Sequence, residues 1–194
     1  MRLRLLGAFA VTALAASGLA ACDSKVGTAA EVGGDRVSES TVNSYLTAQA
    51  VPFVTSGGTS VVPRTIVLQT LIQTKLLERA LQAHGGAPTS AELSEARAAV
   101  LRGTTEAEQI AQLVKYGFKP AFASAYINSF VLDSVLANRL HASSAADIVS
   151  ALQQLDVPVA VNPRYGSWEP KTFSLGEPQP PTFLTLPSAT APVG

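Results

Sequence analysis

Few side chains in this sequence are suited to chemistry. The chain contains one cysteine, Cys22, and two histidines, His84 and His141, and neither histidine has a carboxylate or another histidine three or four residues away. A metal site on a helix needs ligands at that spacing, and a serine nucleophile needs a histidine base. The GxSxG motif is also missing. The sequence therefore predicts no catalytic residue, no metal site and no cofactor, and both histidines are expected near helix ends.

The charge balance argues against nucleic acid as a partner. The full chain has 14 basic and 14 acidic residues, and loss of residues 1–21 would remove two arginines and no acid, leaving 12 basic and 14 acidic side chains. A nucleic-acid site would need a basic surface instead. The glycine pairs at residues 33–34, 57–58 and 85–86 lack the lysine and hydroxyl residue that follow in a phosphate-binding loop.

The single cysteine follows a segment that is typical of export. Arg2 and Arg4 precede an apolar stretch at residues 5–19, and Ala20 and Ala21 come directly before the cysteine. A helix of about 15 residues is about 22 Å long, shorter than the roughly 30 Å hydrocarbon core of a bilayer. We therefore expect residues 1–21 to be a cleaved signal peptide and not a permanent span.

The tetrapeptide Leu19-Ala20-Ala21-Cys22 resembles the lipobox of bacterial lipoproteins. The resemblance implies that diacylglycerol alkylates the Cys22 thiol and that the signal is cut immediately before it. Each buried methylene contributes about 0.8 kcal/mol, so two or more acyl chains would anchor the protein. Residues 22–28 would then tether it to the outer face of the plasma membrane. The alternative is an ordinary signal peptide whose removal leaves a free thiol.

Four aromatic residues form a helical stripe. Phe118, Phe122, Tyr126 and Phe130 are spaced by four, which places them on one side of a helix. Such stripes are mostly buried in a core. A stripe that is partly exposed can instead line a groove for unfolded or extended polypeptide. The spacing leaves both interpretations open, with one part of the stripe buried and the other lining a cleft.

Apolar periodicity and capping residues predict a mainly helical protein of five or six helices. These helices are expected from residue 39 to about 50, from 63 to the glycines at 85–86, from 90 to 103, from 106 to 117, from 121 to about 140, and from 145 to 155.

Two short strands are expected at opposite ends of this helical body. Residues 159–161 alternate with a period of two, and residues 30–32 form the other candidate. A lone strand would leave its backbone groups unpaired, so the two segments are expected to pair as a two-stranded ribbon. Tyr165 and Trp168 would clamp the second strand onto the helices. Residues 29–173 would form the domain, and residues 174–194, with five prolines, a disordered tail.

The order of these elements resembles the N-terminal chaperone domain of the SurA and PrsA class of extracytoplasmic foldases. The matching stretches are AAEVGGDRVSESTVNSYL, TIVLQTLIQTKLLERALQAHGG, APTSAELSEARAAVL, TTEAEQIAQLVKYGF and KPAFASAYINSFVLDSVLANRL. VNPRYGSWEP is similar to the segment that returns to the helical domain in such foldases. Only 20 residues lie between Leu140 and Val161, too few for the inserted parvulin-type isomerase domain. The resemblance therefore implies a chaperone domain without isomerase activity.

Two functions fit these observations. The first is a membrane-anchored, extracytoplasmic lipoprotein that binds non-native polypeptide weakly and broadly through the aromatic stripe, without catalysis. The second is a structural or adaptor lipoprotein that docks one folded partner of the cell envelope through a specific interface.

Overall fold

The computed structural model describes residues 26–54 and 60–176, and this part of the chain contains six α-helices and seven short strands. The helices are α1 (Glu39–Ser44), α2 (Pro63–Ala83), α3 (Ser90–Leu101), α4 (Glu106–Val114), α5 (Pro120–Leu140) and α6 (Ala145–Gln154). The strands are β1 (Thr28–Val32), β2 (Asp35–Ser38), β3 (Phe53–Val54), β4 (Ser60–Val61), β5 (Val159–Val161), β6 (Trp168–Glu169) and β7 (Ser174–Leu175). The prediction of a mainly helical protein is confirmed.

Strands from opposite ends of the described chain pair with one another. β1 runs antiparallel to β5, with Ala30 opposite Val161 and Val32 opposite Val159. The predicted pairing is therefore confirmed in its segments. It was incomplete, because β2 pairs with the other edge of β1 and makes a three-stranded sheet.

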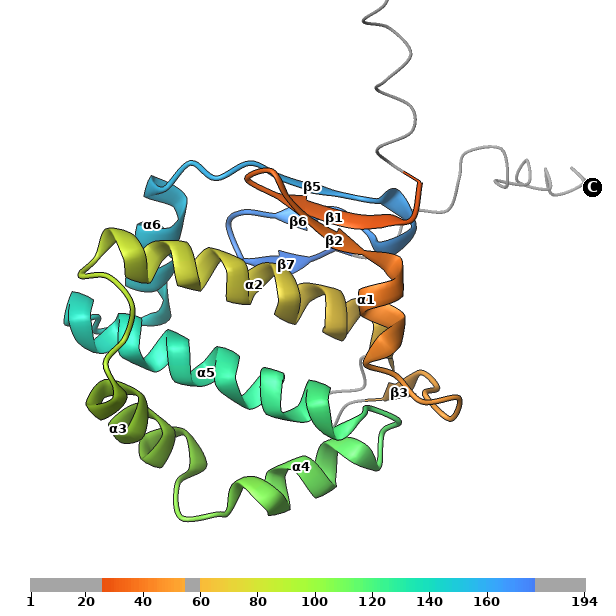
Figure 1. Ribbon diagram of the computed structural model, residues 1–194. Coiled ribbons are helices and arrows are strands. Elements are labelled where there is room, and N and C mark those ends of the chain that lie inside the picture. Colours follow the sequence, from red (N-terminus) through yellow and green to blue (C-terminus); the bar gives the residue numbers. More distant parts are fainter. Residues whose placement is uncertain (1–25, 55–59, 177–194) are drawn as a thin grey trace, which may run out of the picture.

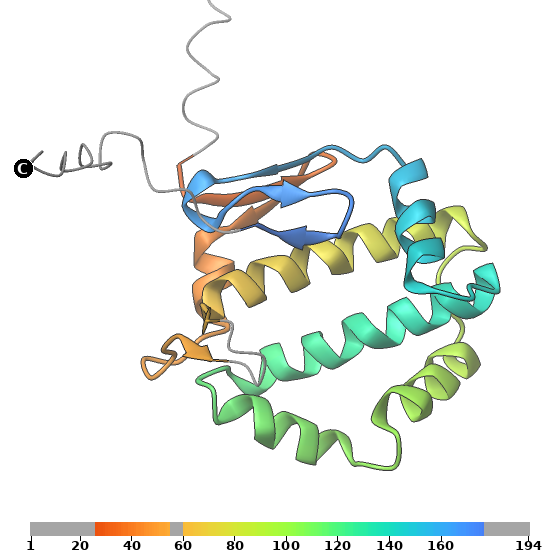
Figure 2. The same ribbon diagram turned by 180° about the vertical axis from the view of Figure 1, so that it is seen from behind.

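The elements are stacked in layers with two long helices in the middle. Figure 1 shows the sheet lying over α2, α2 lying over α5, and α3 and α4 on the far side of α5. In the view from behind, the β6–β7 hairpin lies beside the sheet, and α6 stands at one end of α2 and α5 (Figure 2). The core lies where α2 faces α5 and the sheet, and its fully buried side chains include Leu68, Ile72, Phe122, Val131 and Leu136.

Local signals set the starts of the helices. Thr89 and Thr105 form capping boxes with Glu92 and Glu108, so side chains satisfy the first free N–H groups of α3 and α4. At α6, the Asp147 carboxylate accepts hydrogen bonds from the N–H and the hydroxyl of Ser144. α2 and α5 instead begin with a proline in the first turn, where no hydrogen-bonded N–H is lost.

Helix α1 ends earlier than the sequence predicts. The expected helix runs to about residue 50, but α1 stops at Ser44. The Thr47 N–H donates to the Gly117 carbonyl at 2.9 Å, and the Lys119 N–H donates to the Tyr45 carbonyl at 2.8 Å. Backbone groups that would continue the helix are thus satisfied by the turn between α4 and α5, and long-range pairing overrides local helix propensity.

The folded domain extends beyond its predicted C-terminal boundary. Ser174 and Leu175 form β7, which is antiparallel to β6, so the boundary predicted at residue 174 is wrong by a few residues. The Trp168 and Phe173 rings meet edge to face at 5.5 Å and hold this hairpin together. Likewise Thr28, the last residue of the predicted tether, already belongs to β1. The predicted signal peptide, Cys22 and residues 177–194 lie outside the described part.

Candidate functional site

The predicted aromatic stripe divides into a buried half and an accessible half. Phe118 and Phe122 are 1% and 0% exposed, whereas Tyr126 is half-buried and Phe130 is 47% exposed. Neighbouring ring centroids lie 4.7, 5.8 and 5.0 Å apart along the stripe. Phe118 and Phe122 therefore form the buried part of the stripe and belong to the core, so they are no longer candidates for peptide binding. Tyr126 and Phe130 remain candidates, because they reach the surface.

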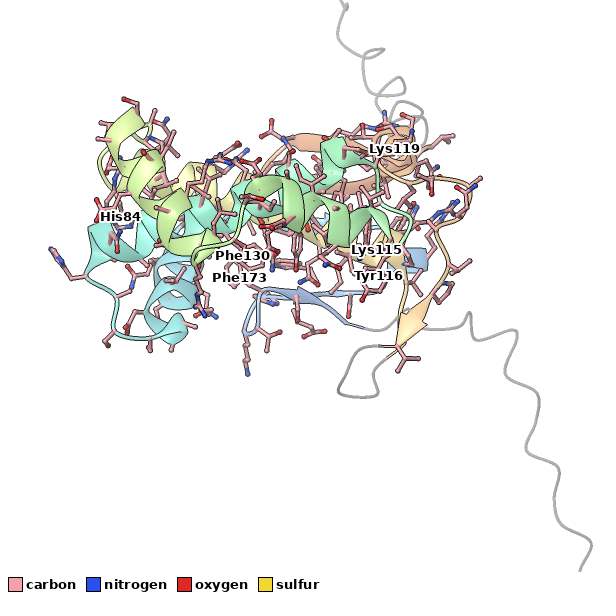
Figure 3. All side chains as sticks on the ribbon, turned by 90° about the horizontal axis from the view of Figure 1, so that it is seen from below. His84, Lys115, Tyr116, Lys119, Phe130 and Phe173 are labelled. Carbon is pink, nitrogen blue, oxygen red and sulfur yellow. The ribbon has the colours of Figure 1, made fainter. Side chains whose placement is uncertain are left out.

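These two rings line a cleft of about 580 Å³. α2 and α5 form its long sides, α6 closes one end, and the β6–β7 hairpin forms the remaining wall. The apolar lining includes Ile66, Leu77, Tyr126, Phe130, Ile148, Val149, Leu152, Phe173 and Leu175. Figure 3, viewed from the side of α3 and α4, shows Phe130 and Phe173 near one another, from α5 and from the hairpin respectively. The cleft has the mainly apolar lining that is typical of sites for small or extended ligands.

A second hollow of about 650 Å³ lies on the other side of the accessible rings, between α5 and the pair α3 and α4. It is lined by Val100, Leu101, Leu113, Tyr116 and Ile127, among others. Tyr126, Phe130 and Asp133 line both hollows, so these side chains form a ridge on α5 between two apolar depressions. An extended segment laid across this ridge would contact both hollows.

Two glutamines of α2 fix the hairpin wall of the cleft. Gln73 Nε2 donates to the Phe173 carbonyl at 2.6 Å, and the Leu175 N–H donates to Gln69 Oε1 at 3.1 Å. Gln69 and Gln73 are one turn apart and therefore share a face of the helix. Their amides thus pair with the Phe173 carbonyl and the Leu175 N–H of the hairpin. Without these partners, both backbone groups would face the apolar cleft unpaired. Neither glutamine was predicted, although their spacing on an apolar helix is a signal that can be found in the sequence.

Asp133 is the one acidic residue among the described residues that line this cleft, and they include no lysine, arginine or histidine. It is half-buried, and its carboxyl forms no hydrogen bond or ion pair with any described residue. Burial raises the pKa of the Asp133 carboxyl, because removal from water penalises the charged form. The residue lies three positions after Phe130 and so shares its face of α5.

The predicted clamp residues lie on the sheet side of the molecule. Tyr165 is buried, and burial together with the nearby Glu39 carboxylate raises the pKa of its hydroxyl. Arg164 Nη1 lies 3.0 Å from Glu39 Oε1, which ties the start of α1 to the segment that follows β5. Trp168 packs on Phe173 in the hairpin. These contacts are structural, and Tyr165 and Trp168 do not line the cleft.

The histidines lie at helix ends, as expected. His84 and His141 are the C-terminal caps of α2 and α5. Within residues 26–54 and 60–176, no three side chains of the metal-binding types come together. In the same part of the chain, no helix combines the length and the apolar character needed to cross a bilayer.

No protein-family model matches the chain, and no curated protein and no solved structure gives a significant match. The resemblance to the SurA and PrsA class therefore rests on the sequence stretches and on the order of the elements.

Proposed function

We propose that this chain is a membrane-anchored, extracytoplasmic binding protein of the chaperone type, which holds non-native polypeptide segments without changing them chemically. The main support is the cleft between α2, α5, α6 and the β6–β7 hairpin, with the partly exposed Phe130 at its edge. Burying an aromatic ring of a client against this lining removes apolar surface from water, which contributes about 25 cal/mol per Å².

The polar groups of the cleft fit the backbone of such a client. Thr65, Gln69 and Gln73 line the cleft beside the apolar side chains. The hairpin uses Gln73 Nε2 and Gln69 Oε1, which leaves Gln73 Oε1 and Gln69 Nε2 for a client. An extended peptide presents N–H and C=O groups that need partners when they leave water. Amide and hydroxyl side chains can donate and accept, so they can meet these groups in either chain direction. Such a lining favours broad binding of extended segments over one defined sequence.

The lipobox supports the location of this activity. β1 begins at Thr28, so five residues separate Cys22 from the folded domain. A chain of that length spans at most about 20 Å. A diacylglyceryl group on Cys22 would therefore keep the domain close to the outer face of the plasma membrane, where exported chains emerge.

A test of this proposal uses the chain from residue 22 onward with Cys22→Ser, because all contacts described above lie within residues 26–176. We expect this protein to suppress the aggregation of a reduced, unfolding client and to bind labelled apolar peptides with micromolar affinity. Phe130→Ser should weaken both effects several-fold, because the ring supplies accessible apolar surface. Val51→Ser removes a side chain that is 63% exposed outside the cleft and serves as the matched control.

The adaptor function makes the opposite prediction. A folded partner needs roughly 800 Å² on each side and is recognised as one defined surface. Saturable binding of a single envelope protein, with no peptide binding and no effect on aggregation, would replace the chaperone proposal with this alternative.

A further inference from the structure

The cleft contains a carboxylate that nothing nearby neutralises. Asp133 is half-buried between the two hollows, and no described side chain forms an ion pair or a hydrogen bond with it. The Asp133 oxygens keep some contact with water, since Glu39 Oε1 is the one fully buried side-chain oxygen without a hydrogen bond among the described residues. Partial burial without a partner still disfavours the charged form in the free protein. An apolar or amide residue at this position would avoid that cost, so the charge is explained better by a ligand than by the stability of the fold.

Two arginines are candidate partners for Asp133, and neither forms an ion pair with it in the described part of the chain. Arg102 lines the hollow between α3, α4 and α5, but the structure records no ion pair between it and Asp133. Arg139, further along α5, is bound to Glu92 at 2.7 Å and to carbonyls at the end of α2. Neither arginine supplies the counter-charge for the Asp133 carboxylate in the described part of the chain.

Two aromatic rings flank the same position. The Tyr126 and Phe130 rings meet edge to face with centroids 5.0 Å apart, and Asp133 follows Phe130 by one helical turn. Aromatic faces attract cations through their quadrupole, and a carboxylate gives a charge-assisted hydrogen bond to an ammonium or guanidinium group. The combination of rings and one acid on a helix face is chemically complementary to a cationic side chain.

We propose that the cleft selects polypeptide segments in which a lysine or arginine neighbours apolar residues, with the cation bound between Asp133 and the rings of Tyr126 and Phe130. This inference rests on the proposed peptide-binding function and names its preferred client. The aliphatic stem of the basic side chain would lie along the apolar wall, while its charged end reaches the carboxylate. Apolar neighbours of the cation would fill the hollows on the two sides of the ridge.

The experiment compares three labelled peptides that share apolar residues and differ only in a central lysine, glutamine or glutamate. With the chain from residue 22 onward carrying Cys22→Ser, we expect the lysine peptide to bind on the order of tenfold more tightly than the glutamine peptide. The glutamate peptide should bind most weakly, because its charge would repel that of Asp133. Asp133→Asn should bring the lysine peptide to the affinity of the glutamine peptide and leave the latter nearly unchanged.

The control variant is Asp156→Asn, which removes the same charge from an exposed position outside the cleft. It should keep the full preference for lysine. Thermal unfolding of Asp133→Asn supplies a second readout: no loss of stability is expected, since the carboxylate has no partner to lose, whereas a structural role predicts a clear loss.

The outcomes separate the two proposals. If apolar peptides bind but the lysine and glutamine peptides bind equally, the preference for basic segments is wrong and the peptide-binding function stands. If Asp133→Asn and Asp156→Asn reduce the preference equally, the effect is one of net charge and the site is overturned. If no peptide binds, the proposed function itself fails.

Discussion

The guanidinium of Arg139 joins three helices that are separate in the sequence. Its Nε and Nη2 atoms donate to the two carboxylate oxygens of Glu92 at 2.7 and 3.0 Å. Its Nη1 atom donates to the carbonyls of His84 and Gly86 at 3.2 and 2.7 Å. One side chain of α5 thus binds the first turn of α3 and satisfies carbonyls at the C-terminal end of α2, where the helix dipole favours a cation.

This ion pair predicts how stability depends on pH. The Arg139 guanidinium, aided by the N–H and hydroxyl of Thr89, lowers the pKa of Glu92 from 4.5 to about 2. Because the pKa is lower in the folded state, the pair contributes fully above about pH 4.5, and its contribution is lost as the pH falls toward 2. Glu92→Gln should therefore lower the unfolding temperature at neutral pH and flatten its decrease on acidification.

Thermal unfolding at several pH values between neutral and 2.5 provides the measurement. Asp35, Glu108 and Asp147 also have lowered pKa values, so some acid sensitivity should persist in the variant. Glu95→Gln removes an exposed carboxylate from the same helix and is the control. If the unfolding temperatures of wild type and Glu92→Gln change with pH in parallel, the ion pair does not contribute to folded stability.

At the scale of elements, the sheet depends on a three-residue strand at its edge. Asn162 N–H donates to the Ala29 carbonyl at 2.9 Å and Gly33 N–H donates to the Pro158 carbonyl at 2.8 Å. Along an antiparallel ladder, every second pair of opposite residues is hydrogen-bonded. Ala160 lies opposite Glu31, midway between the two pairs above. The backbone of Ala160 therefore also exchanges hydrogen bonds with β1.

Ala160→Pro should therefore destabilise the whole domain. The substitution removes the N–H that donates to β1, and we expect a loss of at least about 1–3 kcal/mol in the free energy of unfolding. Ala160→Thr is the matched control, because the side chain is exposed and a β-branched residue suits a strand. Denaturant unfolding measures both variants. If Ala160→Pro and Ala160→Thr unfold at the same denaturant concentration, the pairing of β5 with β1 does not stabilise the domain.

The sequence predicted the elements whose signals are local. Capping residues and prolines mark the starts of α2 to α6 within a few residues, and the requirement for a strand partner was enough to pair residues 30–32 with 159–161. It did not predict the end of α1 or the strand β7, because both depend on contacts with distant residues such as Gly117 and Gln69.

The spacing of the aromatic stripe was correct, but spacing alone cannot show which of its side chains are buried in the core and which reach the surface. Asp133 gains its importance only from the cleft around it.

In the whole molecule, the sheet lies on one side of α2 and α5 (Figure 1), and the second hollow lies on the other. The sheet, whose first strand begins six residues after Cys22, lies on the opposite side of α2 from α5, α3 and α4 (Figure 1). With a lipid on Cys22, the sheet would be the layer nearest the bilayer. The second hollow, between α5 and the pair α3 and α4, would then face away from the membrane, toward arriving polypeptide.

If Cys22 carries the proposed lipid, loss of the thiol should change the location of the protein without changing its fold. In a bacterial host supplied with a labelled fatty acid, we expect the wild-type chain to incorporate the label and to enter the detergent phase on partitioning. Cys22→Ser should remain unlabelled and partition into the aqueous phase, while its thermal unfolding matches that of the delipidated domain, because Thr28 begins the folded part. Ser24→Ala, two residues away, should behave like the wild type. Retention of the label by Cys22→Ser would show that the thiol is not the acceptor, and an unlabelled wild type would leave the short N-terminal apolar segment as an ordinary signal.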